Sequence, residues 1–158
     1  MTNLADVQAA RDLLAKVDAE ECELLYDLQV YKARESLLDY VRFMTPDPDK
    51  PGDPRLSQYE VHPVHKLLAQ TLERVERGEM KRVILTLPPR TGKTELASHK
   101  FPTWFLGRDP RRSVICATYN GVFAGDYGIA MKELLKSERY QQVFPGVQLL
   151  GDARGSLR

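Results

Sequence analysis

Cysteine is scarce in this chain, since Cys22 and Cys116 are the only two among 158 residues. They lie far apart, and neither belongs to a Cys-x-x-Cys pair or has a histidine at ligand spacing. The sequence therefore argues against a disulfide framework and against a metal held by cysteine. Cys22 falls in a helical pattern and Cys116 in an apolar run, so both are expected to be small, buried, hydrophobic side chains.

Net charge and long apolar runs are lacking as well. The 23 basic and 22 acidic residues nearly cancel, so no global electrostatic field attracts the chain to nucleic acid. No apolar run approaches the roughly 20 residues of a membrane span, and the start of the chain lacks the parts of a signal peptide. We expect a single soluble domain in the cytoplasm, with no membrane partner.

One local basic cluster remains, at Arg108, Arg111 and Arg112. Arginines grouped in this way can contact DNA phosphates. A solvated, charged turn between two elements explains the same residues and is the interpretation we favour.

The most informative segment is a Gly-Lys-Thr triplet, a phosphate-loop (Walker A) signature, between an apolar run at residues 82–86 and a helical pattern that begins at Glu95. Gly92 lets the backbone approach a phosphate, and the surrounding amides point at the positive end of the following helix. The Lys93 ammonium can reach the β- and γ-phosphates, and the Thr94 hydroxyl can ligate Mg²⁺. The segment therefore predicts a site for ATP and Mg²⁺, made by Pro89, Arg90, Thr91, Gly92, Lys93 and Thr94. The competing interpretation is a surface turn with a stray lysine.

This loop departs from the general phosphate-loop pattern in one respect. Leu87 stands where the usual first glycine would be, five residues before Gly92. Pro88 and Pro89 instead fix two φ angles and stiffen the entry to the loop. Arg90 adds a second cation near the γ-phosphate, so Arg90 and Lys93 are the expected catalytic residues.

The remaining patterns predict an order of elements. Residues 1–45 form a helical N-terminal arm, as one helix or as two parted near Asp18, and residues 46–58 form a Pro/Asp-rich linker. In the ATPase part, residues 59–158, we expect a helix from about Glu60 to Arg77 that ends at Gly78, then strand, phosphate loop, helix, strand and helix. A βαβ unit of this kind implies an α/β fold, a partial phosphate-loop NTPase whose parallel sheet has flanking helices. The arm either packs on this core, which is favoured, or contacts a neighbouring subunit or partner protein.

The loop string Leu-Pro-Pro-Arg-Thr-Gly-Lys-Thr-Glu-Leu-Ala-Ser, residues 87–98, resembles the deviant phosphate loop of the large terminase subunits of tailed bacteriophages. These subunits are the motors that pack DNA into capsids. The resemblance continues through segments 101–110, 114–120 and 137–147, and upstream through 59–78, so that it covers roughly residues 34 to 150.

The resemblance implies an ATPase that powers translocation of double-stranded DNA into a capsid in the cytoplasm of a bacterial host. Its implied partners are the phage portal and the small terminase subunit, which the arm could contact, with a homo-oligomer when full length. It further implies that Tyr59, His62 and His65 contact adenine, although a histidine is more often an ordinary surface or core residue. Tyr119 and Asn120 are similar to a family segment near the γ-phosphate and DNA, and they also suit a turn at the end of a strand.

A packaging ATPase also needs an apolar strand that ends in Asp, followed by an acidic residue that polarises the attacking water. No such segment follows Thr94, because Gln148 and Gly151 interrupt the nearest candidate at residues 147–152. The family's nuclease domain is missing too. We therefore expect an N-terminal ATPase fragment that is inactive alone. The alternatives are a truncated prophage remnant that binds nucleotide at most, and a helicase-like ATPase of the same superfamily.

Overall fold

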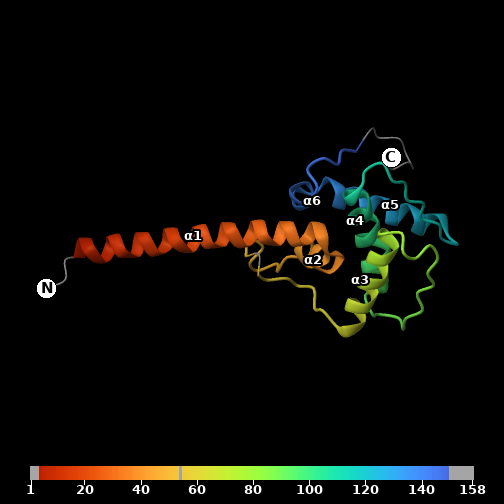
Figure 1. Cartoon of the computed structure of the whole chain (residues 1–158), viewed down its shortest axis with the longest axis horizontal. Helices are drawn as coiled ribbons and strands as arrows, with labels where there is room; N and C mark the ends of the chain where they lie inside the picture. The colour runs from red at the N-terminus through yellow and green to blue at the C-terminus, as the bar shows by residue number, and fades with distance from the viewer. Residues whose placement is uncertain (1–3, 54, 150–158) are drawn as a thin grey trace.

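The structure, a computed structural model, describes residues 4–53 and 55–149, with the side chains of the first helix described from Glu20 onward. Figure 1 shows one long helix that projects as an arm and a group of shorter helices around its C-terminal end. The elements are α1 Leu4–Glu35, α2 Leu37–Phe43, α3 Pro63–Glu76, the π-helix η1 Glu95–Lys100, α4 Phe101–Arg108, α5 Gly121–Lys136 and α6 Glu138–Val143. None of these helices is both long and apolar enough to cross a membrane.

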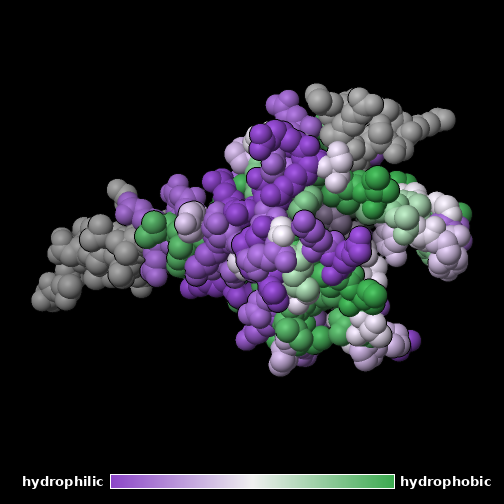
Figure 2. All heavy atoms as spheres, turned by 45° about the vertical axis from the view of Figure 1, so that its right-hand side comes forward, coloured by the Kyte–Doolittle hydropathy of each residue, from purple (hydrophilic) through white to green (hydrophobic). Residues whose placement is uncertain are grey.

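The prediction of an α/β fold with a parallel sheet and flanking helices is wrong. The described residues are all-α, and their single β-pairing is an isolated antiparallel bridge between Pro46 and Ser57. The two apolar runs expected to be strands pair with nothing, and Ile84 and Ile115 are each 93% exposed. Apolar, β-branched residues favour a pleated surface, but a strand also needs a neighbour for its backbone hydrogen bonds. Figure 2 shows hydrophobic residues over the end of the molecule away from the arm.

The helical predictions agree better with the structure. Helix α1 is continuous with no break near Asp18, and the predicted arm of residues 1–45 divides instead at Ser36, between α1 and α2. The side chain of Ser36 caps α2 by accepting a hydrogen bond from the Asp39 amide. Helix α3 ends at Glu76 with Arg77 as its C-cap, and Gly78 follows as expected, with a φ of 76° that allows the left-handed turn after the helix.

The core lies where α2 meets the C-terminal end of α1, and α3, η1, α4, α5 and α6 all add buried side chains to it. Trp104 is 1% exposed, and its indole N–H donates to the Ala33 carbonyl of α1 over 3.0 Å. The Tyr140 hydroxyl donates to the Thr103 carbonyl over 3.0 Å, and the Tyr40 hydroxyl lies 2.9 Å from the Thr103 hydroxyl. The buried aromatic side chains thus have their polar atoms satisfied by helix α4 and its neighbours.

The expectation of two buried cysteines is wrong, since Cys22 and Cys116 are both exposed. Cys22 lies in the arm, and Cys116 lies in an apolar run whose expected sheet neighbours are not there. Their helical and apolar sequence surroundings therefore predicted the wrong burial, because the tertiary partners differ from those we assumed.

The arginine cluster after α4 is held by carboxylates. Arg108 lies 3.0 Å from Glu35 of α1, and Arg112 lies 2.7 Å from Glu76 of α3. Arg111 pairs locally with Asp109 at 2.9 Å and stays solvated, its side chain being 90% exposed. Two of the three arginines therefore fasten the end of α4 to the helices beside it, a role that the sequence did not predict.

Candidate functional site

The segment that joins the apolar run to η1 forms a tight loop with two left-handed residues. Arg90 has a φ of 63° and Gly92 a φ of 71°. The Thr91 hydroxyl donates to the Pro88 carbonyl over 2.8 Å and closes the turn. A left-handed conformation suits Gly92 but is strained for Arg90, so the surrounding structure must hold it there.

Two cations and the start of a helix meet at this loop. Helical backbone begins at Lys93 and runs through η1 into α4, and no side-chain cap closes the start of η1. The first amides of a helix have no partners within the helix and carry its positive end. In the part of the chain that the structure describes, neither Arg90 nor Lys93 forms an ion pair. The loop therefore presents uncompensated positive charge.

The structure brings Tyr59, His62 and His65 to the same loop. These three side chains share a hollow of about 660 Å³ with the residues Thr45, Gln58, Glu60, Val64, Arg90, Thr91 and Gly92. Its size falls in the ordinary range of small-molecule sites, about 300 to 1,000 Å³. Residues expected at the two ends of a nucleotide therefore line one hollow, although they lie 25 to 33 positions apart in the sequence.

His65 connects the start of α3 to the loop. Its Nδ1 lies 3.2 Å from the His62 amide nitrogen and also 3.2 Å from the Glu60 carbonyl. The Nε2 atom lies 3.0 Å from the Thr91 carbonyl, to which it donates. His65 is 7% exposed, and Gly92 is close enough that a Cβ there would lie 3.1 Å from His65 Nε2. His65 thus fixes the position of the loop backbone.

Tyr59 has a polar atom without a partner. Its hydroxyl is buried and makes no hydrogen bond within the described residues, and it lies 3.8 Å from where a Cβ at Gly92 would be. Burial, and then the charge of Glu95, raises the pKa of Tyr59, so the hydroxyl keeps its proton at neutral pH. A buried, unpaired donor beside the loop would gain a hydrogen bond from a ligand oxygen or nitrogen.

Helix η1, which follows the loop, contains an acidic side chain that pairs with two basic ones. Glu95 lies 2.9 Å from His99 and 3.4 Å from Lys100, whose side chain is buried. Burial alone would raise the pKa of Glu95, but the hydrogen bond to His99 and the charge of Lys100 outweigh it and lower that pKa.

The π-helical form of η1 has a cause in the sequence, because Pro102 has no N–H to donate to the preceding turn.

Pro89, Lys93 and Thr94 of the loop do not line this hollow, and Tyr119 and Asn120 lie outside it as well. Tyr119 is 93% exposed, and the side chain of Asn120 caps α5 by accepting from the Val122 amide over 2.9 Å. Asn120 therefore acts as the turn residue that its type favours. Conversely, Thr45 and Gln58 line the hollow although no motif marked them, because only the folding of the linker brings them there.

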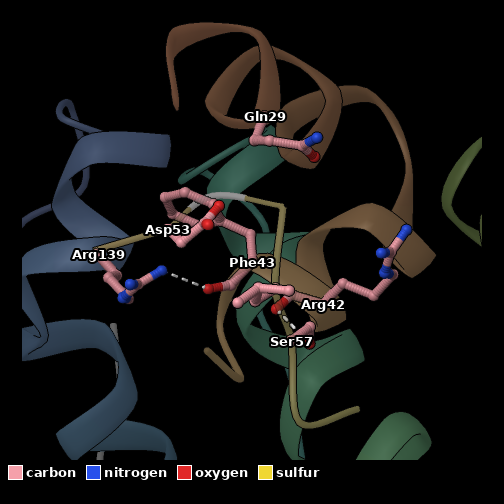
Figure 3. Close-up of a pocket in the computed structure, with 7 residues that line it drawn as sticks. Gln29, Arg42, Phe43, Asp53, Ser57 and Arg139 are labelled. Atoms are coloured by element: carbon pink, nitrogen blue, oxygen red, sulfur yellow. Dashed lines mark hydrogen bonds between the residues drawn. The ribbon is translucent and has the colours of Figure 1, made fainter. Parts of the chain in front are cut away.

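A second hollow lies between α1, α2, the linker and α6, and Figure 3 shows how its side chains fill it. Its volume of about 10 Å³ gives room for one water molecule at most. The Arg139 guanidinium crosses it, donates to the Phe43 carbonyl over 2.9 Å and also binds the Pro51 carbonyl. Ser57 on the linker donates to the Arg42 carbonyl over 2.9 Å. Side chains that pack these elements together fill this hollow, so it is not a ligand site.

A bound Mg²⁺ would fit the donor set at the loop. No group of three or more His, Cys, Asp or Glu side chains able to hold a metal occurs in the described residues. Mg²⁺ at nucleotide sites needs few protein ligands, because it keeps several waters and binds the phosphates. The exposed Thr94 at the start of the helix could supply such a ligand.

In comparisons with known proteins, no protein-family model, no curated protein and no solved structure matches this chain. An interpretation of the site therefore depends on its own residues and geometry.

Proposed function

We propose that this chain binds Mg·ATP at the loop of residues 89–94, as the nucleotide-binding region of a phage DNA-packaging terminase large subunit. The observation that carries the proposal is the hollow beside Gly92, where the loop and the side chains of Tyr59, His62 and His65 face one another. The proposal depends on this loop and its surroundings and needs no β-sheet.

Each residue has a defined part in the proposed site. Lys93 and Arg90, which lack ion-pair partners in the described part of the chain, would neutralise the β- and γ-phosphates. Thr94 would ligate Mg²⁺, and the amides at the start of the helix would bind phosphate oxygens. The hollow lined by Tyr59 and His62 would receive the base, and the unpaired Tyr59 hydroxyl, which lies beside Gly92, would donate to a nucleotide oxygen. When bound, ATP supplies the phosphoanhydride bond whose hydrolysis would drive transport.

The direct test is binding of Mg·ATP by the purified chain, measured by titration calorimetry. We expect Lys93→Ala to weaken binding at least about tenfold, since a charged contact to phosphate contributes roughly 1.5–3 kcal/mol. Lys136→Ala is the matched control, because Lys136 is an exposed lysine at the end of α5. Equal affinity of wild type and Lys93→Ala would refute the site.

The packaging role comprises hydrolysis and transport of double-stranded DNA at a portal, with the small terminase subunit and further copies of this chain as partners, in the cytoplasm of a bacterial host. It is supported by the resemblance of residues 87–98 to the packaging motors. Its test is DNA-dependent ATP hydrolysis when the chain is combined with double-stranded DNA, a phage portal and a small terminase subunit. Hydrolysis that is unchanged by DNA in that mixture would contradict the role.

A second candidate function is nucleotide binding without turnover. One observation favours it: the sequence after Thr94 contains no apolar strand that ends in paired acids. The carboxylate that directly follows the loop, Glu95, already forms ion pairs with His99 and Lys100. Phosphate release by the chain alone distinguishes the two candidates, since release equal to that of Lys93→Ala means binding only, and release well above it means an ATPase.

A further inference from the structure

Helix α1 carries two apolar stripes, and only one of them is covered. Tyr26, Val30 and Ala33 pack against the core. Leu24, Leu28 and Tyr31 are 71%, 44% and 63% exposed. Successive residues of an α-helix are turned by about 100°, so these two stripes lie on opposite sides of α1.

The exposed stripe lies on the arm, with the rest of the molecule on the other side of it. Figure 1 shows α1 running away from the group of shorter helices, and Figure 2 shows hydrophobic residues on its projecting part. A second helix could therefore lie along the stripe without meeting α2, α4 or α6. Large, exposed leucines that gather on one face of a helix normally mark an interaction surface.

The spacing of the stripe identifies the kind of partner. Leu24, Leu28 and Tyr31 are four and three residues apart, which is the spacing of the a and d positions of a coiled coil. In the sequence of the same helix this spacing continues backward through Val17, Leu14, Ala10 and Val7, with Glu21 as its only polar member. A seam of this length suits a helix as long as α1.

We propose that two copies of this chain associate through α1 as a parallel, in-register, two-stranded coiled coil. The charges that flank the stripe favour a second copy as the occupant. Asp27 and Lys32 occupy the g and e positions beside it, and both are exposed. In a parallel pair Asp27 of each copy faces Lys32 of the other, and two-fold symmetry makes this contact twice.

An antiparallel pair satisfies these charges less well. It brings g positions next to g positions, so that Glu20 and Asp27 of the two copies would lie near one another. Neither Asp27 nor Lys32 forms an ion pair within the described part of one chain, so both are free to pair between copies.

The first test is the molar mass of the full chain by light scattering across a range of concentrations, with affinity by analytical ultracentrifugation. Wild type should be a dimer. Leu24→Glu should weaken the dimer by roughly a hundredfold or more, because it places a carboxylate from each copy in the apolar seam. Leu67→Glu is the matched control, since Leu67 is a 66% exposed leucine on α3. A monomeric wild type, or equal loss in both variants, overturns the proposal.

Cross-linking tests the parallel register. In a Cys22→Ser, Cys116→Ser background, Leu24→Cys places one thiol from each copy in the same d layer, and mild oxidation should join them. Leu67→Cys in the same background should not cross-link. A dimer of the Leu24→Cys variant that forms no disulfide between its copies would be antiparallel or made with another surface, and either result overturns the arrangement.

Glu21→Leu tests the seam in the opposite direction. Glu21 would face its copy at an a position, so its replacement by leucine should tighten the dimer at least about tenfold. Equal or weaker association would contradict this register. Nucleotide binding is measured separately with Lys93→Ala, so failure of the dimer and failure of the proposed function are distinguishable.

Discussion

Gly107, in the last turn of α4, is packed so closely that alanine should be destabilising there. A Cβ at Gly107 would lie 2.4–2.6 Å from three ring atoms of Phe144. Phe144 is 7% exposed and has little room to retreat. Overpacking of a core costs about 1–3 kcal/mol, and these short distances favour the upper end. Alanine recovers about 1 kcal/mol of helix propensity, so we expect Gly107→Ala to lose about 2 kcal/mol of the free energy of unfolding.

Gly125 in α5 provides a control with the opposite expected sign. Nothing lies within 4 Å of a Cβ at Gly125, so Gly125→Ala should stabilise the chain by up to about 1 kcal/mol. Chemical denaturation followed by circular dichroism measures both variants at the same pH. A Gly107→Ala variant as stable as Gly125→Ala would refute the packing of α4 against Phe144. Replacing Phe144 by leucine in the Gly107→Ala background should recover part of the loss.

Two further predictions follow from buried and strained groups. Burial raises the pKa of Tyr140 well above its ordinary value, so the native state keeps a proton that the unfolded state loses above about pH 10. The contribution of Tyr140 to the free energy of unfolding should therefore be constant below that pH and fall above it. Tyr140→Phe should make the fall of stability shallower in urea titrations from pH 8 to 11; parallel curves would contradict this. Arg90→Gly should stabilise the fold by about 1 kcal/mol, because glycine adopts the left-handed conformation without strain, and should also weaken Mg·ATP binding. A variant that changes both quantities in the same direction would refute our account of Arg90.

Helices could be predicted from this sequence because their signals are local. Ser36 before an apolar run and Gly78 after one mark a helix start and a helix end through hydrogen bonds within a few residues. Gly78 illustrates this well: its amide bonds the Val75 carbonyl, and the Glu79 amide bonds the Arg74 carbonyl. These contacts form whatever the rest of the chain does, so the end of α3 agrees with expectation.

The sheet could not be predicted from the same kind of signal. The runs around Ile84 and Ile115 have suitable residues, but pairing depends on segments far away in the sequence. Along residues 83–87, the exposed Ile84 and Thr86 alternate with the half-buried Val83, Leu85 and Leu87. A period of two is therefore present without the hydrogen-bonded ladder that defines a sheet. Periodicity predicts which side chains face the body but not whether a neighbouring strand exists.

The candidate site was predictable in part. The residue types of the loop indicate phosphate chemistry by themselves, whereas the approach of Tyr59 and His65 to the loop was suggested only by the family resemblance. Nothing in the sequence indicated the unpaired Tyr59 hydroxyl, because its environment is made by the linker and α3 together. Burial of single polar atoms depends on tertiary packing, which short patterns do not encode.

The arginines show why the loop stands out. Arg108 and Arg112 pair with carboxylates, and Arg139 donates to the Phe43 carbonyl. Each of these contacts fastens one helix to another element. Arg90 does the opposite: it occupies a strained left-handed conformation and has no ion-pair partner in the described part of the chain. The proposed site would explain this strained cation: beside an unpaired Lys93 at the start of a helix, the ligand of Arg90 would be an anion.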